Sequence, residues 1–120
     1  MTPPRHVHPM ELRFGKLVID LSSYRVLLNE FPVILPYREY ALLVYMAARA
    51  GRIVSKRQLM EEGLGRHDPG GLRMVDEHVR HIKFQLERTG GPIIREVDGA
   101  GYRFELKRTP GETGQAKADS

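Results

Sequence analysis

The stretch LRMVDEHVRHIKFQLER, residues 72–88, decides the fold of this chain. Its apolar residues recur at helical spacing, and four of them form one narrow stripe: Val75, Val79, Ile82 and Leu86. The sequences HDPGG at 67–71 and TGGP at 89–92 cannot continue a helix. The pattern therefore predicts one long helix that packs along its apolar stripe and exposes its opposite face.

Two shorter helices are expected before the long one. Between residues 37 and 50 apolar side chains recur every three or four positions, and Gly51 is placed to end that helix. The sequence SKRQ at 55–58 is a capping box, in which the first and last side chains each bond the other's backbone amide. A second helix is expected to begin there and to end by Gly63 or Gly65.

Alternating patterns flank these helices. Residues 11–35 contain short runs in which every second residue is apolar, so three or four antiparallel strands are expected. Residues 93–106 form two more runs around Asp98-Gly99, a dipeptide typical of tight hairpins. A sheet, three helices and a hairpin make an α+β fold of the winged helix-turn-helix kind. In that fold the third helix enters a DNA groove and the hairpin, the wing, lies beside it.

The chain length of 120 residues fits one domain. We expect a flexible start over residues 1–10, a winged-helix domain over 11–106 and a disordered tail over 107–120, which has no apolar residue larger than alanine. No apolar segment matches a membrane span or a signal peptide. We therefore expect a cytoplasmic, nucleoid-associated protein without membrane contacts.

The net charge of +4 favours a polyanionic partner, but residues 11–106 hold 15 basic and 13 acidic residues, so the placement of charge matters more than its total. Without cysteine the chain has no disulfide or thiolate site. His78 and His81 lie one helical turn apart without a third ligand, so we expect no metal and no cofactor. No spacing typical of catalytic residues is found, and we expect no enzyme activity.

Four segments resemble the OmpR/PhoB-type DNA-binding domain of bacterial response regulators. They are LPYREY at 35–40, VSKRQL at 54–59, RMVDEHVR at 73–80 and VDGAGYRF at 97–104. The resemblance extends over about residues 11–106 and implies sequence-specific binding to double-stranded DNA in transcription regulation. Members of this family usually carry an amino-terminal receiver domain that is phosphorylated on aspartate. These 120 residues hold no such domain, and we favour a natural stand-alone domain.

The resemblance also implies which residues contact DNA. Arg73 and His78 match positions that often touch the phosphate backbone. Arg80, His81 and Lys83 match positions that read the groove. The full set of candidate DNA-binding residues is Arg73, His78, Arg80, His81, Lys83, Phe84, Arg88, Gly99 and Tyr102.

A helical wheel set by the apolar stripe supports part of this assignment. It puts Arg73, Arg80 and Phe84 opposite the core, with His81 and Arg88 on one shoulder of the helix. Arginine reads guanine edges with two hydrogen bonds and also binds phosphates. The alternative is a polar face that is only solvated, and we favour DNA binding.

Several interpretations stay open at this point. Tyr102 either touches the DNA backbone, as in the family, or packs between the wing and the helix. Phe84 is either a solitary exposed aromatic residue or a contact for a thymine methyl group or a second copy. Asp98 stands at the wing tip where the family usually has arginine. With Glu77 and Glu96 it favours an alternative function, a protein–protein interaction module with weak or lost DNA binding.

Double-stranded DNA is the main expected partner, bound by two copies on neighbouring half-sites. The family is thought to meet RNA polymerase through the loop between the second and third helices. By resemblance, the loop from Gly63 to Gly71 would do so here.

Overall fold

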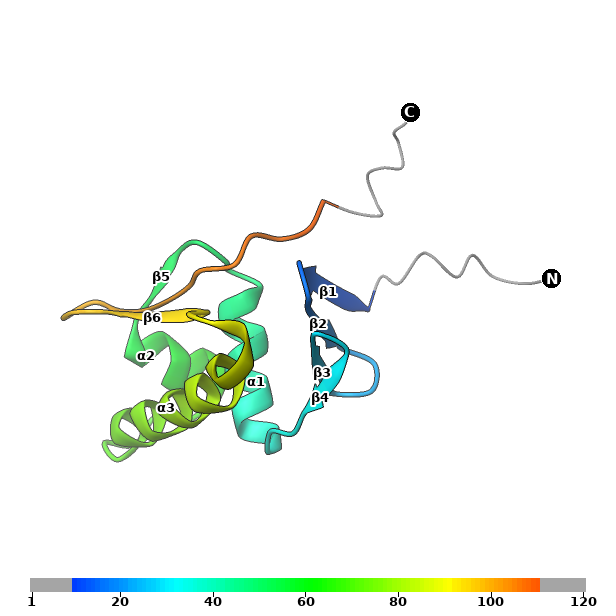
Figure 1. Ribbon diagram of the computed structural model, residues 1–120. Coiled ribbons are helices and arrows are strands. Elements are labelled where there is room, and N and C mark those ends of the chain that lie inside the picture. Colours follow the sequence, from blue (N-terminus) through cyan, green and yellow to red (C-terminus); the bar gives the residue numbers. More distant parts are fainter. Residues whose placement is uncertain (1–9, 111–120) are drawn as a thin grey trace.

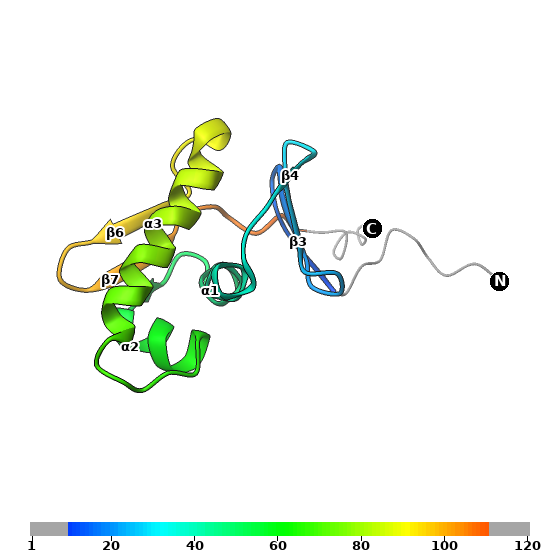
Figure 2. The same cartoon turned by 90° about the horizontal axis from the view of Figure 1, so that it is seen from below.

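The computed structural model describes residues 10–110, and their elements follow the predicted order (Figure 1). In both views helix α1 lies between the amino-terminal sheet and helix α3 (Figure 2). The elements are β1 (Glu11–Phe14), β2 (Leu17–Asp20), β3 (Arg25–Leu28), β4 (Phe31–Val33), α1 (Tyr37–Ala47), β5 (Ile53–Val54), α2 (Lys56–Gln58), the π-helix η1 (Leu59–Gly63), α3 (Gly71–Gly90), β6 (Ile94–Val97) and β7 (Gly101–Phe104).

The first four strands form an antiparallel meander in the order β1-β2-β3-β4. Alternation puts Leu17 and Leu28, which are register partners, on the face that packs against the helices. The turn between β3 and β4 places Asn29 and Glu30 at φ 54° and 72°, the conformation that a tight hairpin needs. The sequence predicts three or four strands here, and the structure has four.

Helices α1 and α2 begin where the sequence predicts. Helix α1 ends at Ala47, ahead of Gly51, and turns fill the residues between them. The capping box of α2 is formed, because the Gln58 amide donates to Ser55 Oγ at 3.0 Å and the Ser55 amide donates to Gln58 Oε1 at 2.9 Å. The chain continues into η1, where the Leu64 amide donates to the Leu59 carbonyl at 3.0 Å.

Helix α3 spans 20 residues and starts and ends slightly outside the predicted range of 72–88. Its stripe is confirmed, since all four side chains are fully buried: Val75, Val79, Ile82 and Leu86. Burying each such side chain contributes about 1.5–3 kcal/mol. The stripe therefore fixes which face of α3 is left for a ligand.

The wing contains a strand that the sequence did not reveal. Strands β6 and β7 form the predicted hairpin, and β5 pairs with the other edge of β7 to make the order β5-β7-β6. Gly101 permits this pairing: its φ is 137°, and a Cβ there would lie 2.0 Å from the Val54 carbonyl oxygen. The three-stranded wing sheet thereby ties the wing to the start of α2.

The chain after β7 joins the two sheets. The Thr109 amide donates to the Arg13 carbonyl at 2.8 Å, and the Gly15 amide donates to Thr109 Oγ1 at 2.8 Å. The sequence predicts a tail that begins at residue 107, and Thr109 of this segment contacts β1. Residues 111–120 lie outside the described part of the chain. No described helix is both long and apolar enough to cross a membrane.

Candidate nucleic-acid interface

The exposed face of α3 carries the side chains that the helical wheel placed opposite the core. Arg73, Arg80 and Phe84 are all exposed, and Phe84 leaves 61% of its surface accessible. The Arg88 guanidinium carbon lies 5.5 Å from the centre of the Phe84 ring, a cation–π contact. Cations and an aromatic ring thus share the exposed face of α3, and Arg88 also lines a groove with residues of β4.

Two histidines at the edge of this face are bound to helix α1. Glu39 is 5% exposed, and no other charged residue among those described is buried. Its Oε2 lies 2.9 Å from His78 Nδ1, and its Oε1 contacts His81 Nδ1. The other nitrogen of His81, Nε2, lies 3.3 Å from Gln85 Nε2. Both imidazoles are therefore held by the protein as well as being placed beside the exposed face.

Sequence reasoning missed Glu39, although a signal was present. Glu39 falls at i, with Leu42, Leu43 and Met46 at i+3, i+4 and i+7, and those three side chains are fully buried. A carboxylate in phase with an apolar stripe must find partners on the element that covers it. Here those partners are the histidines of α3.

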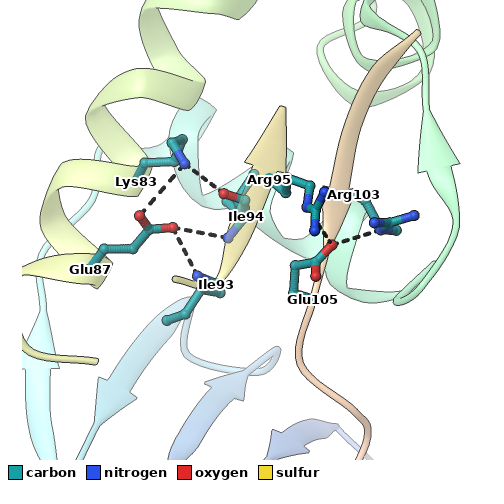
Figure 3. Close-up of polar contacts among 7 residues, drawn as sticks. All are labelled: Lys83, Glu87, Ile93, Ile94, Arg95, Arg103 and Glu105. Carbon is teal, nitrogen blue, oxygen red and sulfur yellow. Dashed lines mark hydrogen bonds and ion pairs between the residues drawn. The ribbon is translucent and has the colours of Figure 1, made fainter. Parts of the chain in front are cut away.

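The carboxyl-terminal half of α3 is bonded to the start of the wing (Figure 3). Glu87 Oε2 accepts the amides of Ile93 and Ile94 at 2.9 and 3.0 Å. Lys83 Nζ donates to the Ile94 carbonyl at 2.6 Å and lies 3.6 Å from Glu87 Oε1. The Lys83 ammonium is thus directed at the wing strand, whereas the resemblance made it a groove-reading group.

The middle of the wing is bonded to α3 through Tyr102. This side chain is 4% exposed, and its hydroxyl donates to Asp76 Oδ1 at 2.7 Å. Lys56 Nζ lies 3.1 Å from the same oxygen. Burial and the hydrogen bond to Asp76 raise the pKa of Tyr102. Partial burial opposes ionisation of Asp76, but the bonds from Tyr102 and Lys56 outweigh it and lower its pKa.

Among the described residues, the turn of the wing at 98–100 contains no Lys or Arg. The Ala100 amide donates to the Val97 carbonyl at 2.9 Å, and Gly99 turns the chain at φ 74°. Asp98 and Glu96 are exposed, and Glu96 Oε2 lies 3.9 Å from Lys56 Nζ. The tip therefore presents negative charge at the end of the hairpin.

The predicted residues thus divide by position. Arg73, Arg80, Phe84 and Arg88 lie on the exposed side of α3. The structure brings His78 and His81 together on Glu39, and it directs Lys83 and Tyr102 into contacts between α3 and the wing. Gly99 lies apart from the helix, at the wing tip.

Comparison with known proteins agrees with this architecture. The transcriptional regulatory protein SrrA of Staphylococcus aureus (strain NCTC 8325 / PS 47) is 35% identical over 99 residues, which cover 80% of this chain and 41% of SrrA. The chain thus spans well under half the length of this curated relative.

Two solved structures are similar over most of the chain. The RstA DNA-binding domain of Klebsiella pneumoniae, solved in complex with the RstA box, superposes with a TM-score of 0.71 at 28% identity, covering 79% of this chain and 96% of that one. The response regulator DrrB of Thermotoga maritima, an OmpR/PhoB homologue, gives a TM-score of 0.70 at 30% identity. The match covers 80% of this chain and 44% of the DrrB chain.

A family model described as "Transcriptional regulatory protein, C terminal" matches residues 30–104, which contain every element from β4 to β7. The chain therefore belongs to the OmpR/PhoB-type family of carboxyl-terminal domains of transcriptional regulatory proteins.

Proposed function

We propose that this domain binds double-stranded DNA in a sequence-specific manner and acts in bacterial transcription regulation, by binding and not by catalysis. The observation that carries the proposal is the exposed face of α3, whose Arg73 and Arg80 stand opposite a fully buried stripe. A helix supported on one side and charged on the other suits the major groove. The RstA domain, which shares this fold, was solved on its DNA box.

In this proposal α3 lies in the major groove and the wing lies on the backbone. Arg80 reads a base edge, and Arg73 binds a phosphate, because both guanidinium groups are exposed. Lys83 and Tyr102 set the angle between wing and helix through the bonds described above. His78 and His81 contact DNA only through the parts of their rings that Glu39 leaves free.

The substitution Arg80→Ala tests the proposal. A duplex selected by the wild type from a random pool is titrated by fluorescence anisotropy. A lost base contact costs about 1–3 kcal/mol, which is about a 5- to 150-fold loss of affinity. The melting temperature should not change, since the side chain is exposed. Arg25→Ala, which removes an exposed arginine from β3, is the control.

Equal affinities of wild type and Arg80→Ala would reject the assignment of Arg80. A wild type that selects no duplex at low salt would reject DNA binding altogether. The second candidate function, a protein-docking module, would then take its place. Exposed Asp98 at the wing tip favours that candidate, because it repels the phosphates that a wing approaches.

Further partners belong to the same proposal. Two copies would occupy neighbouring half-sites on DNA, within the nucleoid of the bacterial cytoplasm. The loop between η1 and α3 would meet RNA polymerase. Its shape supports this role, because Arg66 binds Asp68 through two bonds, Nε to Oδ1 at 2.8 Å and Nη2 to Oδ2 at 2.7 Å. A loop braced in this way presents a fixed surface.

A further inference from the structure

A row of cations, exposed except for the half-buried Arg103, lies along the wing sheet and the segment that follows it. Arg95 and Arg103 are register partners on neighbouring strands. Arg103 also lines one shallow groove with Lys107 and Arg108. The bonds of Thr109 to the β1–β2 turn bring the row beside Lys16. We call these five residues the basic strip: Lys16, Arg95, Arg103, Lys107 and Arg108.

The basic strip keeps most of its charge. Among its acidic neighbours, Glu105 is bonded to the strip, since its Oε2 lies 2.6 Å from Arg103 Nε and 3.8 Å from Arg95 Nε, and Glu11 and Glu30 line a groove with Lys16. Two guanidinium groups thus share one carboxylate. Within residues 10–110, none of the ion pairs formed involves Lys16, Lys107 or Arg108.

The proposed DNA face is poorer in charge by comparison. On α3 the exposed Arg73, Arg80 and Arg88 are accompanied by exposed Glu77, and the wing adds exposed Glu96 and Asp98. The basic strip therefore carries a larger positive excess than the proposed recognition surface. A polyanion attracted by long-range charge would be drawn to the strip.

The basic strip and α3 lie on different sides of the wing. In Figure 3 the side chains of Arg95, Arg103 and Glu105 lie on one side of β6, and Lys83 and Glu87 of α3 lie on the other. In Figure 1 the segment after β7 runs above the helices, whereas α3 lies below. Arg95 and Arg103 thus lie on the other side of β6 from Lys83 and Glu87 of α3, so a ligand on the strip need not displace DNA held on α3.

We propose that the basic strip binds the phosphate backbone of a second DNA segment, so that one domain bridges two duplexes. This goes beyond the proposed function, which uses α3 and the tip of the wing, whereas Arg95 and Arg103 lie on the wing strands on the side away from Lys83 and Glu87 of α3. The extended backbone of this segment presents its cations in a row, and a DNA strand presents its phosphates in a row as well. A protein partner fits less well, because interfaces between proteins need an apolar centre and Ile53, 46% exposed, is the one large exposed apolar residue near Arg103.

A capture experiment tests the bridge. Beads carry the duplex selected by the wild type, the domain is added, and a labelled random duplex is offered in solution. Lys107→Glu should reduce capture of the second duplex about tenfold or more at moderate salt, and should flatten the slope of log affinity against log salt by about 0.9 for one lost phosphate contact. Binding to the bead duplex should not change. Arg25→Glu also replaces an exposed cation by glutamate, but on β3, away from the strip, and should behave like the wild type.

Each outcome decides the question. The proposal is overturned if the wild type captures no second duplex. It is also overturned if Lys107→Glu captures as much second duplex as Arg25→Glu does, because the bridge would then arise from pairing between copies. Arg80→Ala separates the two proposals. If it leaves binding to the bead duplex unchanged while Lys107→Glu removes binding to random duplex, the role of α3 fails and the basic strip stands.

Discussion

Replacing Glu87 should uncouple the wing from α3 and lower stability by a predictable amount. One carboxylate oxygen accepts the amides of Ile93 and Ile94, whose residues are each 1% exposed. In Glu87→Ala two buried donors lose their acceptor, at about 1–3 kcal/mol each. Because the Glu87 side chain is 23% exposed, water can enter the space it leaves. We therefore expect a loss of about 2–4 kcal/mol in the free energy of unfolding.

Denaturant unfolding followed by circular dichroism measures this loss, and hydrogen exchange locates it. Glu87→Gln keeps one acceptor oxygen without charge and should lose only about 1 kcal/mol. Glu77→Ala, an exposed change on the same helix, should stay within about 0.5 kcal/mol of the wild type. If Glu87→Ala proved as stable as Glu77→Ala, with the Ile93 and Ile94 amides still protected, the reasoning would be refuted.

Two further predictions concern the wing and its contacts. Asp98→Arg should tighten binding to any duplex and steepen the salt slope by about 0.9, because a repulsive group becomes a phosphate partner; identical salt series for mutant and wild type would show that the tip does not touch DNA. Asp76 has a lowered pKa in the fold, so its ionised form stabilises the fold above the ordinary value of 3.8, and this contribution is lost as the pH falls through the lower folded pKa. Asp76→Asn should therefore be less stable at neutral pH and lose less stability on acidification, which denaturant unfolding at several pH values would test; parallel pH profiles would contradict it.

Local patterns were sufficient for the elements that the sequence predicted well. The stripe of α3 needs only helical periodicity, and Asp98-Gly99 needs only the preferences of a tight turn. The capping box at 55–58 is likewise read from neighbouring residues. Each of these features depends on interactions within a few positions, and each is present in the structure.

The features that were missed depend on distant partners. Strand β5 has two residues, too few for an alternating pattern, and its pairing with β7 joins segments far apart in the sequence. The direction of Lys83 is set by the Ile94 carbonyl, and that of Tyr102 by Asp76. A helical wheel gives the side of a helix but not the atom that a long side chain will find. The same limit applies to the partners of Glu39: its phase with the α1 stripe indicates burial, but the two histidines that bind it belong to another helix.

The contacts at the two ends of the described chain have a practical consequence for immobilising the domain. The Met10 carbonyl accepts the Leu21 amide, and Thr109 is bonded to the turn after β1, so both ends leave the fold beside the same edge strand. Both views show this edge on the far side of α1 from α3. A tether joined to either end would hold the domain on a sensor surface with α3 facing the solution. Measurements with the two tethers should then give the same affinity for DNA.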